Sequence, residues 1–210
     1  MPDDVMVADH VEADELREIL GVPTHFVLDK VFPHLDRHSR HFISLSPFLC
    51  IGTSGAEGGQ DVSPRGDPPG FVKVIDDRTI LIPERPGNKR ADTMTNITEN
   101  PNVGLIFLLP GIEINLRMNG RARVVEDPEL LSGMEVRGKA PKLGILVDIN
   151  EVYFHCAKAV IRSGLWKPET QIDRKDFPTH AQVTRDQQDP DGDLAPHEAR
   201  IEDSKKHNLY

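Results

Sequence analysis

Short apolar runs separated by turn residues dominate the middle of the chain. FLCIGTS, QDVS, FVKVI, TILI and VGLIFLL alternate with turns rich in Gly, Pro and Asp, and INLRMNGRARVV has the alternation of a half-buried strand. A last strand is expected from Gly144 to Cys156. Parallel strands would need a crossover helix between each pair, and the spacing supplies none. The pattern therefore predicts a small, mainly β antiparallel barrel of about six strands with flanking helices, an α+β arrangement.

Helical periodicity is concentrated at the N-terminus, and it is lost at the other end. Three helical segments are predicted at residues 12–20, 24–35 and 36–44. From about Gln171 onward the chain has almost no apolar periodicity and a high charge density. We therefore expect a helical segment packing on the barrel (1–44), the barrel (45–170), and a polar tail that is partly disordered or lies on a partner subunit (171–210).

One helix interrupts the strands, from about Asn88 to Glu99. Ala91, Met94 and Ile97 fall at three-residue steps, and the proline after Asn100 requires the helix to end there. A short helix at residues 157–163 is expected to follow the last strand.

The start of the internal helix has an unusual charge pattern. A helix N-terminus presents unpaired N–H groups and the positive end of the dipole, so acidic residues are expected there. Lys89 and Arg90 stand in this place instead, directly after a Pro-Gly pair. A phosphate monoester would satisfy the amides, the ammonium and the guanidinium together. The alternative is that both side chains extend into solvent and pair with Glu84, Asp92 or an acidic residue of the tail.

Composition limits the other classes of function. The formal net charge is -9, with 34 acidic and 25 basic residues, so a broad nucleic-acid surface is not expected and any anion site must be local. No apolar run is long enough to span a bilayer, and the acidic N-terminus is unlike a signal peptide, so we expect a cytoplasmic protein without membrane contact. Cys50 and Cys156 have neither disulfide nor zinc spacing, and no carboxylate or Cys completes a site with His34, His38 and His41, so no metal is expected.

Five segments in this order resemble a known superfamily. They are DVSPRGDPPGFVKV, IPERPGNKR, ITENPNVGLIF, RMNGRARVVED and CAKAVIRSGLW, within about Phe42 to Pro168. Together they resemble the pyridoxamine 5'-phosphate oxidase-like, FMN-binding split-barrel superfamily, and within it a branch of FMN-dependent enzymes of unassigned substrate. The resemblance implies an antiparallel split barrel, noncovalently bound FMN, and a homodimer with the flavins in clefts at the subunit interface.

The resemblance also implies which residues grip the phosphate of FMN. A basic pair at the start of the internal helix does so in such proteins, and Lys89 and Arg90 occupy that place here. Asn88 is expected to add an amide donor. Arg85 is expected to contact either the phosphate or the ribityl chain.

Two further segments are expected to contact the isoalloxazine ring. The strand that ends with Ile82 and Pro83 would lie along the ring, and Ser63 and Arg65 would approach it from the SPRGDPPG loop. An Arg near N1 and the C2 carbonyl would stabilise the anionic reduced flavin. The alternative partners of Arg65 are two aspartates of the same segment, Asp61 and Asp67.

A late segment is expected to contribute across the dimer interface. Lys158 and Arg162 are like charges at positions i and i+4, a mildly unfavourable arrangement that indicates an anionic neighbour. The resemblance makes these two residues and Trp166, the single tryptophan, candidates for contacts with the flavin of the partner subunit. The alternative for Trp166 is an ordinary interface or core aromatic.

These expectations favour an FMN-dependent oxidoreductase that acts on an unidentified small molecule. Hydride transfer at the flavin requires positioning more than acid or base groups, so no catalytic residue is assigned. True pyridoxamine 5'-phosphate oxidases end in an Arg-rich segment that closes over the substrate, and the tail after Gln171 has no counterpart, so pyridoxamine phosphate is not the expected substrate. The alternative is a non-catalytic binding or sensor protein of the same fold that holds flavin, deazaflavin or haem.

Overall fold

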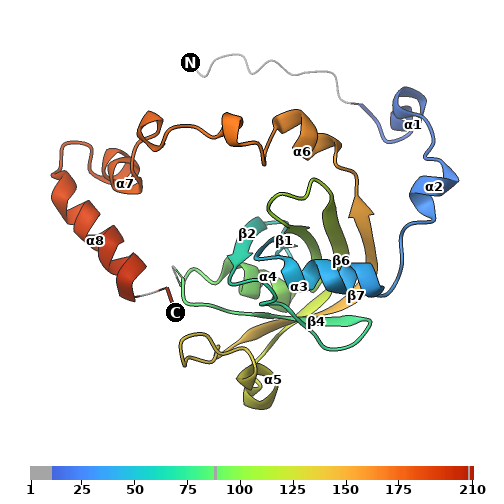
Figure 1. Ribbon diagram of the computed structural model, residues 1–210, viewed down its shortest axis with the longest axis horizontal. Coiled ribbons are helices and arrows are strands. Elements are labelled where there is room, and N and C mark those ends of the chain that lie inside the picture. Colours follow the sequence, from blue (N-terminus) through green and yellow to red (C-terminus); the bar gives the residue numbers. More distant parts are fainter. Residues whose placement is uncertain (1–10, 88, 208) are drawn as a thin grey trace. The chain divides into compact units, whose positions relative to one another are not determined.

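The computed structural model describes residues 11–87, 89–207 and 209–210 (Figure 1). The chain divides into two units between Val31 and Phe32. The first unit contains α1 (Glu15–Leu20) and α2 (His25–Leu28), and neither helix buries a residue. Both helices are shorter than expected. The second helix in particular stops at Leu28, well before Pro33.

The second unit is built on one antiparallel sheet of seven strands (Figure 1). Its order is β2-β1-β5-β6-β7-β4-β3, and every pairing is antiparallel. The strands are β1 (Phe48–Ser54), β2 (Gln60–Gly66), β3 (Lys73–Val74), β4 (Thr79–Pro83), β5 (Asn102–Leu108), β6 (Asn115–Val125) and β7 (Gly144–His155). The mainly β class and the antiparallel split barrel are confirmed. The sheet has one strand more than the expected six or so, and its shortest strand, β3, lies within the expected run FVKVI and pairs only through Lys73 and Val74.

The core lies between the strands and the helices that pack on them. In β1 the burial pattern alternates, with Leu49 and Ile51 fully buried, as its sequence predicts. Phe107 of β5 is also fully buried. Helix α3 (Arg37–Leu45) adds Phe42 and Ile43 to the same core. Its N-terminus is capped by Asp36, whose carboxylate accepts from the N–H groups of His38 and Ser39.

The long central strand β6 contains a bulge at Asn119 and Gly120 where its register against β7 shifts. A Cβ at Gly120 would overlap the carbonyl oxygen of Asp148 on β7. The close approach of the two main chains therefore requires glycine at this position.

Strand β2 extends further than its sequence indicates. Ser63, Pro64 and Arg65 lie within it, although the proline predicts a loop. Proline is tolerated because β2 pairs only with β1 and forms one edge of the sheet. The expected loop position of Arg65 was therefore wrong, and the strand fixes the position of its main chain.

The internal helix also begins later than expected. Helix α4 covers Asp92–Glu99, so Lys89 and Arg90 precede it and do not belong to its first turn. Lys89 and Ala91 have φ angles of 63° and 61°, in the left-handed region that non-glycine residues rarely adopt. These two residues interrupt the helical path, which apolar periodicity does not reveal.

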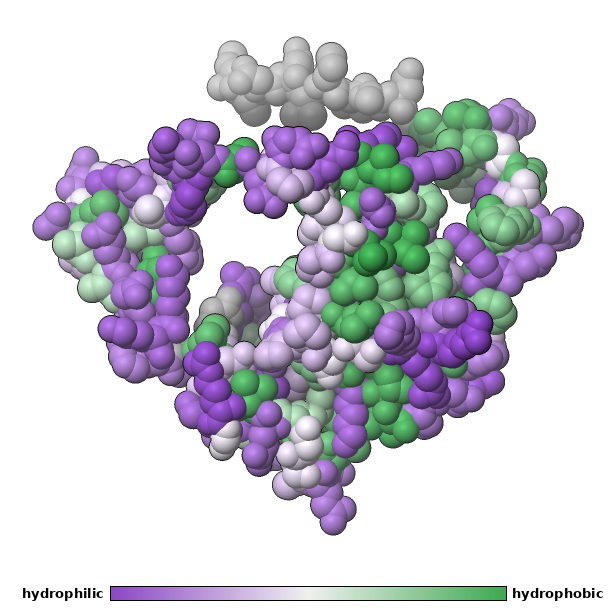
Figure 2. Space-filling model, viewed as in Figure 1, coloured by the Kyte–Doolittle hydropathy of each residue, from purple (hydrophilic) through white to green (hydrophobic). Residues whose placement is uncertain are grey.

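The tail contains helices that its sequence pattern did not predict, and the expectation that it is partly disordered or lies on a partner subunit stays a prediction. After α5 (Pro128–Ser132) and α6 (Lys158–Ser163) come two 3-10 turns at Pro168–Thr170 and Arg174–Asp176, then α7 (His180–Gln188) and α8 (Leu194–His207). Figure 2 shows a mostly hydrophilic surface over α7 and α8. Only Ala181 of α7 is buried, and α8 buries no residue.

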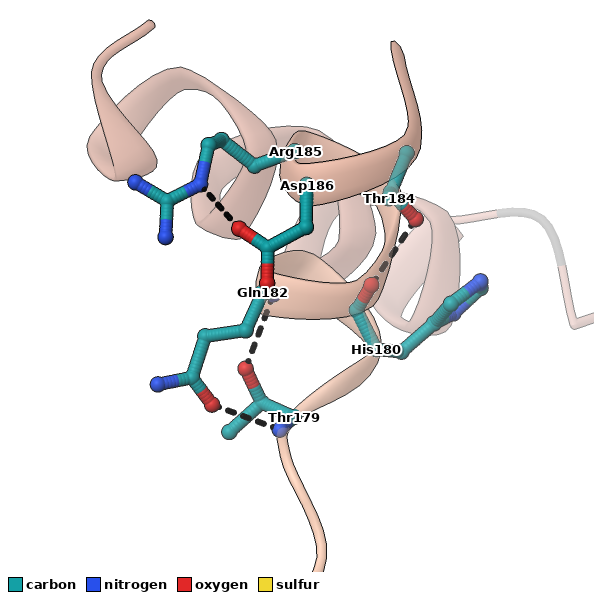
Figure 3. A network of polar contacts seen from close by, with 6 residues as sticks. All are labelled: Thr179, His180, Gln182, Thr184, Arg185 and Asp186. Carbon is teal, nitrogen blue, oxygen red and sulfur yellow. Dashed lines mark hydrogen bonds and ion pairs between the residues drawn. The ribbon is translucent and has the colours of Figure 1, made fainter. Parts of the chain in front are cut away.

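Local hydrogen bonds account for the start of α7. Thr179 Oγ1 accepts from the Gln182 N–H (3.1 Å), and the Gln182 side chain accepts from the Thr179 N–H (2.7 Å), which forms a complete capping box (Figure 3). The Thr184 hydroxyl donates to the His180 carbonyl one turn earlier (Figure 3). Capping therefore supports this helix where apolar burial does not.

Candidate functional site

A cavity of about 1240 Å³ opens on the second unit. Its walls are β2, the end of β4, the segment that leads into α4, and the loop at residues 139–143, with Leu209 and Tyr210 at one end. Small-molecule pockets typically have volumes of roughly 300 to 1,000 Å³. The cavity therefore has room for a large cofactor and a second small molecule.

The structure brings most of the residues singled out in the sequence to this cavity. Six of them line it: Ser63, Arg65, Pro83, Arg85, Lys89 and Arg90. Ile82 is fully buried in the core, in register with Ile145 of β7, so its side chain does not face the cavity. The expectation for Asn88 lies outside the described residues.

The late candidates lie away from the cavity of their own subunit. Lys158 and Arg162 are exposed on α6, and Trp166 donates from Nε1 to the carbonyl of Ile112 (3.0 Å). None of the three lines the cavity. Their predicted contact with a flavin requires the partner subunit and stays a prediction.

Arg65 is held at the cavity wall by an acidic partner that the sequence did not reveal. Its Nη1 forms an ion pair with Glu84, rather than with Asp61 or Asp67. The Arg65 side chain is 14% exposed, and its Nε is buried without a hydrogen-bond partner among the residues that the structure describes. A buried donor without an acceptor is costly, and a ligand oxygen or nitrogen would relieve that cost.

Arg85 is anchored by protein groups on two sides. Its Nε pairs with Asp67 Oδ2 at 2.6 Å, and its Nη2 donates to the Met134 carbonyl at 2.9 Å. The Asp67 side chain is fully buried. Arg85 therefore links the β2 end of the cavity to the segment after α5, and only its remaining donors are left for a ligand.

The segment before α4 carries accessible positive charge at the cavity. Lys89 is exposed and forms no ion pair with another described residue. Arg90 Nε pairs with Asp92 Oδ2 at 2.7 Å, as the solvent alternative predicted. The Arg90 side chain is nevertheless 73% exposed, and surface pairs of this kind contribute little, typically below about 1 kcal/mol. An anion with two charges would compete well for Arg90.

The main chain of this segment is strained and pinned. The left-handed conformations of Lys89 and Ala91 each cost on the order of 1 kcal/mol. The Thr93 hydroxyl donates to Asp61 Oδ2 at 2.6 Å and ties the first turn of α4 to β2. Strained residues that the surrounding structure holds in place are typical of binding sites.

Tyr210 is a cavity residue that sequence reasoning missed. Its hydroxyl donates to Asp67 Oδ1 at 2.8 Å, and Lys139 Nζ donates to its main-chain oxygen at 2.7 Å. The hydrogen bond to Asp67, together with burial and the charge of that carboxylate, raises the pKa of Tyr210, so the phenol remains a donor near neutral pH. No periodicity or motif marks this residue, because its partners lie far away in the sequence.

Neither a metal-binding group of side chains nor a membrane-spanning helix is found in the part of the chain that the structure describes. No three His, Cys, Asp or Glu side chains are grouped there so that they could hold a metal ion. None of the helices there combines the length and the apolar character needed to cross a membrane.

Several solved structures share parts of the fold at low sequence identity. HupZ from Group A Streptococcus is 16% identical, over 57% of this chain and 93% of that one, with a TM-score of 0.48. An FMN-binding protein from Syntrophomonas wolfei is 15% identical, over 68% and 93%, with a TM-score of 0.44. General Stress Protein 26 from Bacillus anthracis is 16% identical, over 56% and 93%, with a TM-score of 0.39.

Family membership rests on the sequence itself. No curated protein matches the chain. Residues 35–156 match the model of the family described as pyridoxamine 5'-phosphate oxidase, and this segment covers more than half of the chain and all strands of the sheet. The chain therefore belongs to the pyridoxamine 5'-phosphate oxidase family.

Proposed function

We propose that the protein is an FMN-dependent oxidoreductase that acts on a small molecule. The observation that carries the proposal is the combination, in one cavity of about 1240 Å³, of a buried unpaired donor on Arg65 and an accessible positive charge on Lys89. A flavin mononucleotide has complementary groups at its two ends, since its ring carries hydrogen-bond acceptors and its phosphate carries nearly two negative charges.

The phosphate end of this proposal is the segment before α4. Lys89 and Arg90 would supply the cationic donors, and the unpaired N–H groups at the start of α4 would supply further ones. Asp92 opposes the phosphate electrostatically, so the affinity depends on how far Arg90 turns away from it.

The ring end is the wall made by β2 and β4. Glu84 holds the guanidinium of Arg65 in place, and Arg65 Nε would donate to an acceptor on the ring edge. Ser63 and Pro83 line the same wall, one as a hydroxyl and the other as an apolar surface without an N–H group. When FMN is bound it supplies the two-electron chemistry, and these residues orient its ring and tune its charge.

The homodimer is part of the same proposal. The cavity of one subunit contains none of Lys158, Arg162 and Trp166, which we propose to reach the flavin of the partner. The mass measured by light scattering should then be close to twice the 23.5 kDa of one chain. A monomer at micromolar concentration would contradict this part of the proposal.

The experiment that tests the proposal is the visible spectrum of the purified protein before and after FMN is added. A bound flavin gives a yellow protein whose colour stays with the protein on gel filtration. An enzyme should then lose the colour with a nicotinamide donor or a substrate in the absence of air and regain it in air. A protein that takes up no FMN would refute the proposal. A protein that binds FMN but does not cycle would support a carrier or sensor.

A further inference from the structure

Tyr210 occupies one end of the cavity and contacts four side chains there. Besides the hydrogen bonds to Asp67 and Lys139, the guanidinium carbons of Arg85 and Arg137 lie 5.9 and 5.0 Å from the centroid of its ring. Both distances are within the range of cation–π attraction. We call the group of Asp67, Arg85, Arg137 and Lys139 the tyrosyl subsite.

The main parts of the tyrosyl subsite are held in place without Tyr210. Asp67 and Arg85 are ion-paired at 2.6 Å, and Arg85 also donates to Met134. The Asp67 N–H donates to the Pro47 carbonyl at 3.1 Å, which fixes its main chain. The Asp67–Arg85 pair is therefore formed independently of the docked tyrosine.

The buried carboxylate of Asp67 needs a second donor. Its side chain is fully buried, Oδ2 accepts from Arg85, and Oδ1 accepts from the hydroxyl of Tyr210. If Tyr210 left, Oδ1 would lose its donor, and an unpaired buried acceptor is unfavourable. The hydroxyl of another phenol would restore this bond.

The charge of the subsite favours an acidic ligand. Three cations, Arg85, Arg137 and Lys139, face one carboxylate, Asp67, which gives a formal charge of +2. Lys139 already donates to an oxygen of Tyr210, so it is positioned for an oxygen of a ligand.

Tyr210 can leave the subsite without exposing a hydrophobic core of the tail. Helix α8 buries no residue, and α7 buries only Ala181. Leu209, the described neighbour of Tyr210, is exposed. The tyrosine is therefore an internal ligand whose tether raises its local concentration, and it competes with any free ligand.

We propose that the tyrosyl subsite binds a phenol that carries an acidic group, and that Tyr210 is its internal competitor. The ligand's hydroxyl replaces that of Tyr210 at Asp67, its ring lies between Arg85 and Arg137, and its acid pairs with Lys139. The inference does not rest on the flavin, although Arg85, Lys139 and Tyr210 also line the cavity, so the ligand would lie beside it.

The test compares three probes by isothermal titration calorimetry on the full chain without added FMN. They are 3-(4-hydroxyphenyl)propionate, 3-phenylpropionate without the hydroxyl, and 2-(4-hydroxyphenyl)ethanol without the acid. The variant Tyr210→Ala should bind the first probe about tenfold more tightly than the natural chain does, because the competitor is gone. In that variant 3-phenylpropionate should bind at least about tenfold more weakly than the first probe, since it leaves Asp67 without a donor.

Two further variants keep the test decisive. Tyr210→Phe keeps the ring but loses the hydrogen bond to Asp67, so its affinity for the first probe should lie between those of the natural chain and Tyr210→Ala. Adding Lys139→Ala to Tyr210→Ala should weaken the acid and leave the alcohol unchanged. Equal affinities of Tyr210→Ala for the hydroxylated and the hydroxyl-free acid would overturn the proposal. No gain of Tyr210→Ala over the natural chain, or no binding to either, would overturn it as well.

Discussion

The double substitution Lys89→Ala with Arg90→Ala should weaken the binding of FMN and leave riboflavin unaffected. Both side chains line the cavity in front of α4, and the two flavins differ only in the phosphate. If the phosphate lies at this segment, removing it from the ligand and removing its cationic partners from the protein abolish the same contact. The ratio of the two affinities therefore reports the phosphate contact and cancels effects on the ring.

The magnitude follows from the exposure of the two side chains. A hydrogen bond between charged groups contributes about 1.5 to 3 kcal/mol when it is well formed. Arg90 is 73% exposed and must leave Asp92, and Lys89 is also exposed, so about 1 kcal/mol for each is more appropriate. The sum of about 2 kcal/mol corresponds to a Kd for FMN that is about 30-fold higher. The Kd for riboflavin should change by less than about twofold.

The assay is a titration that follows the quenching of flavin fluorescence, with both ligands and three proteins. The matched control is Arg174→Ala with Lys175→Ala, which removes the same two charges from adjacent positions that do not line the cavity. It should leave both affinities unchanged. Equal losses for FMN and riboflavin in the Lys89 and Arg90 variant would show that the pair does not hold the phosphate. A similar loss in the control would show a general charge effect.

Three further substitutions test the site and the fold. Asp92→Asn removes the competing partner of Arg90, so FMN should bind up to about fivefold more tightly in the same titration, with riboflavin unchanged; weaker binding of FMN would contradict the position of the phosphate. Gly120→Ala should lower Tm by roughly 5 to 10 °C in calorimetry, because its Cβ would overlap the Asp148 carbonyl. Gly59→Ala, with nothing near its Cβ, should leave Tm unchanged, and an unchanged Tm for Gly120→Ala would refute the close approach. Burial raises the pKa of Asp36, but hydrogen bonds from Ser39 and His38 outweigh it, so the net pKa is lowered. The carboxylate therefore stabilises the fold above about pH 4, and this stabilisation is lost as the pH falls through the folded pKa. Asp36→Ala should therefore lower the free energy of unfolding by about 1 kcal/mol at pH 7, with a difference that shrinks below about pH 4; a difference independent of pH would contradict the role of the charged cap.

The sheet could be predicted because its strands carry their own pattern. Strand β1 matches its expected bounds, and β5, β6 and β7 differ from theirs by about one residue, because turn residues bound each apolar run and burial alternates along β1 and β5. Strand β3 lies within the run FVKVI that the sequence predicts, but only Lys73 and Val74 of that run pair with β4.

The segment before α4 could be predicted only in part. Lys89, Arg90 and Ala91 are compatible with a helix by propensity, and nothing local shows that the main chain turns left-handed at positions 89 and 91. The charge pattern nevertheless singled out two residues that line the cavity, because the anomaly of two cations near a helix start does not depend on where the first turn begins.

The ion pairs of the cavity could not be predicted from the sequence. Arg65 pairs with Glu84, 19 residues away in the sequence, and not with the nearer Asp61 or Asp67, and Arg85 pairs with Asp67. Such choices depend on how β2 and the end of β4 meet, which is a property of the whole sheet. Tyr210 lies 143 residues from Asp67 in the sequence, and its contact with Asp67 could not be predicted either.

A crystal structure of the protein with FMN tests the central claim most directly. We expect a flavin in the cavity of about 1240 Å³, with its phosphate within hydrogen-bond distance of Lys89 and Arg90 and its ring beside Arg65. A flavin bound elsewhere, or with its phosphate directed away from the segment before α4, would refute the proposed FMN site.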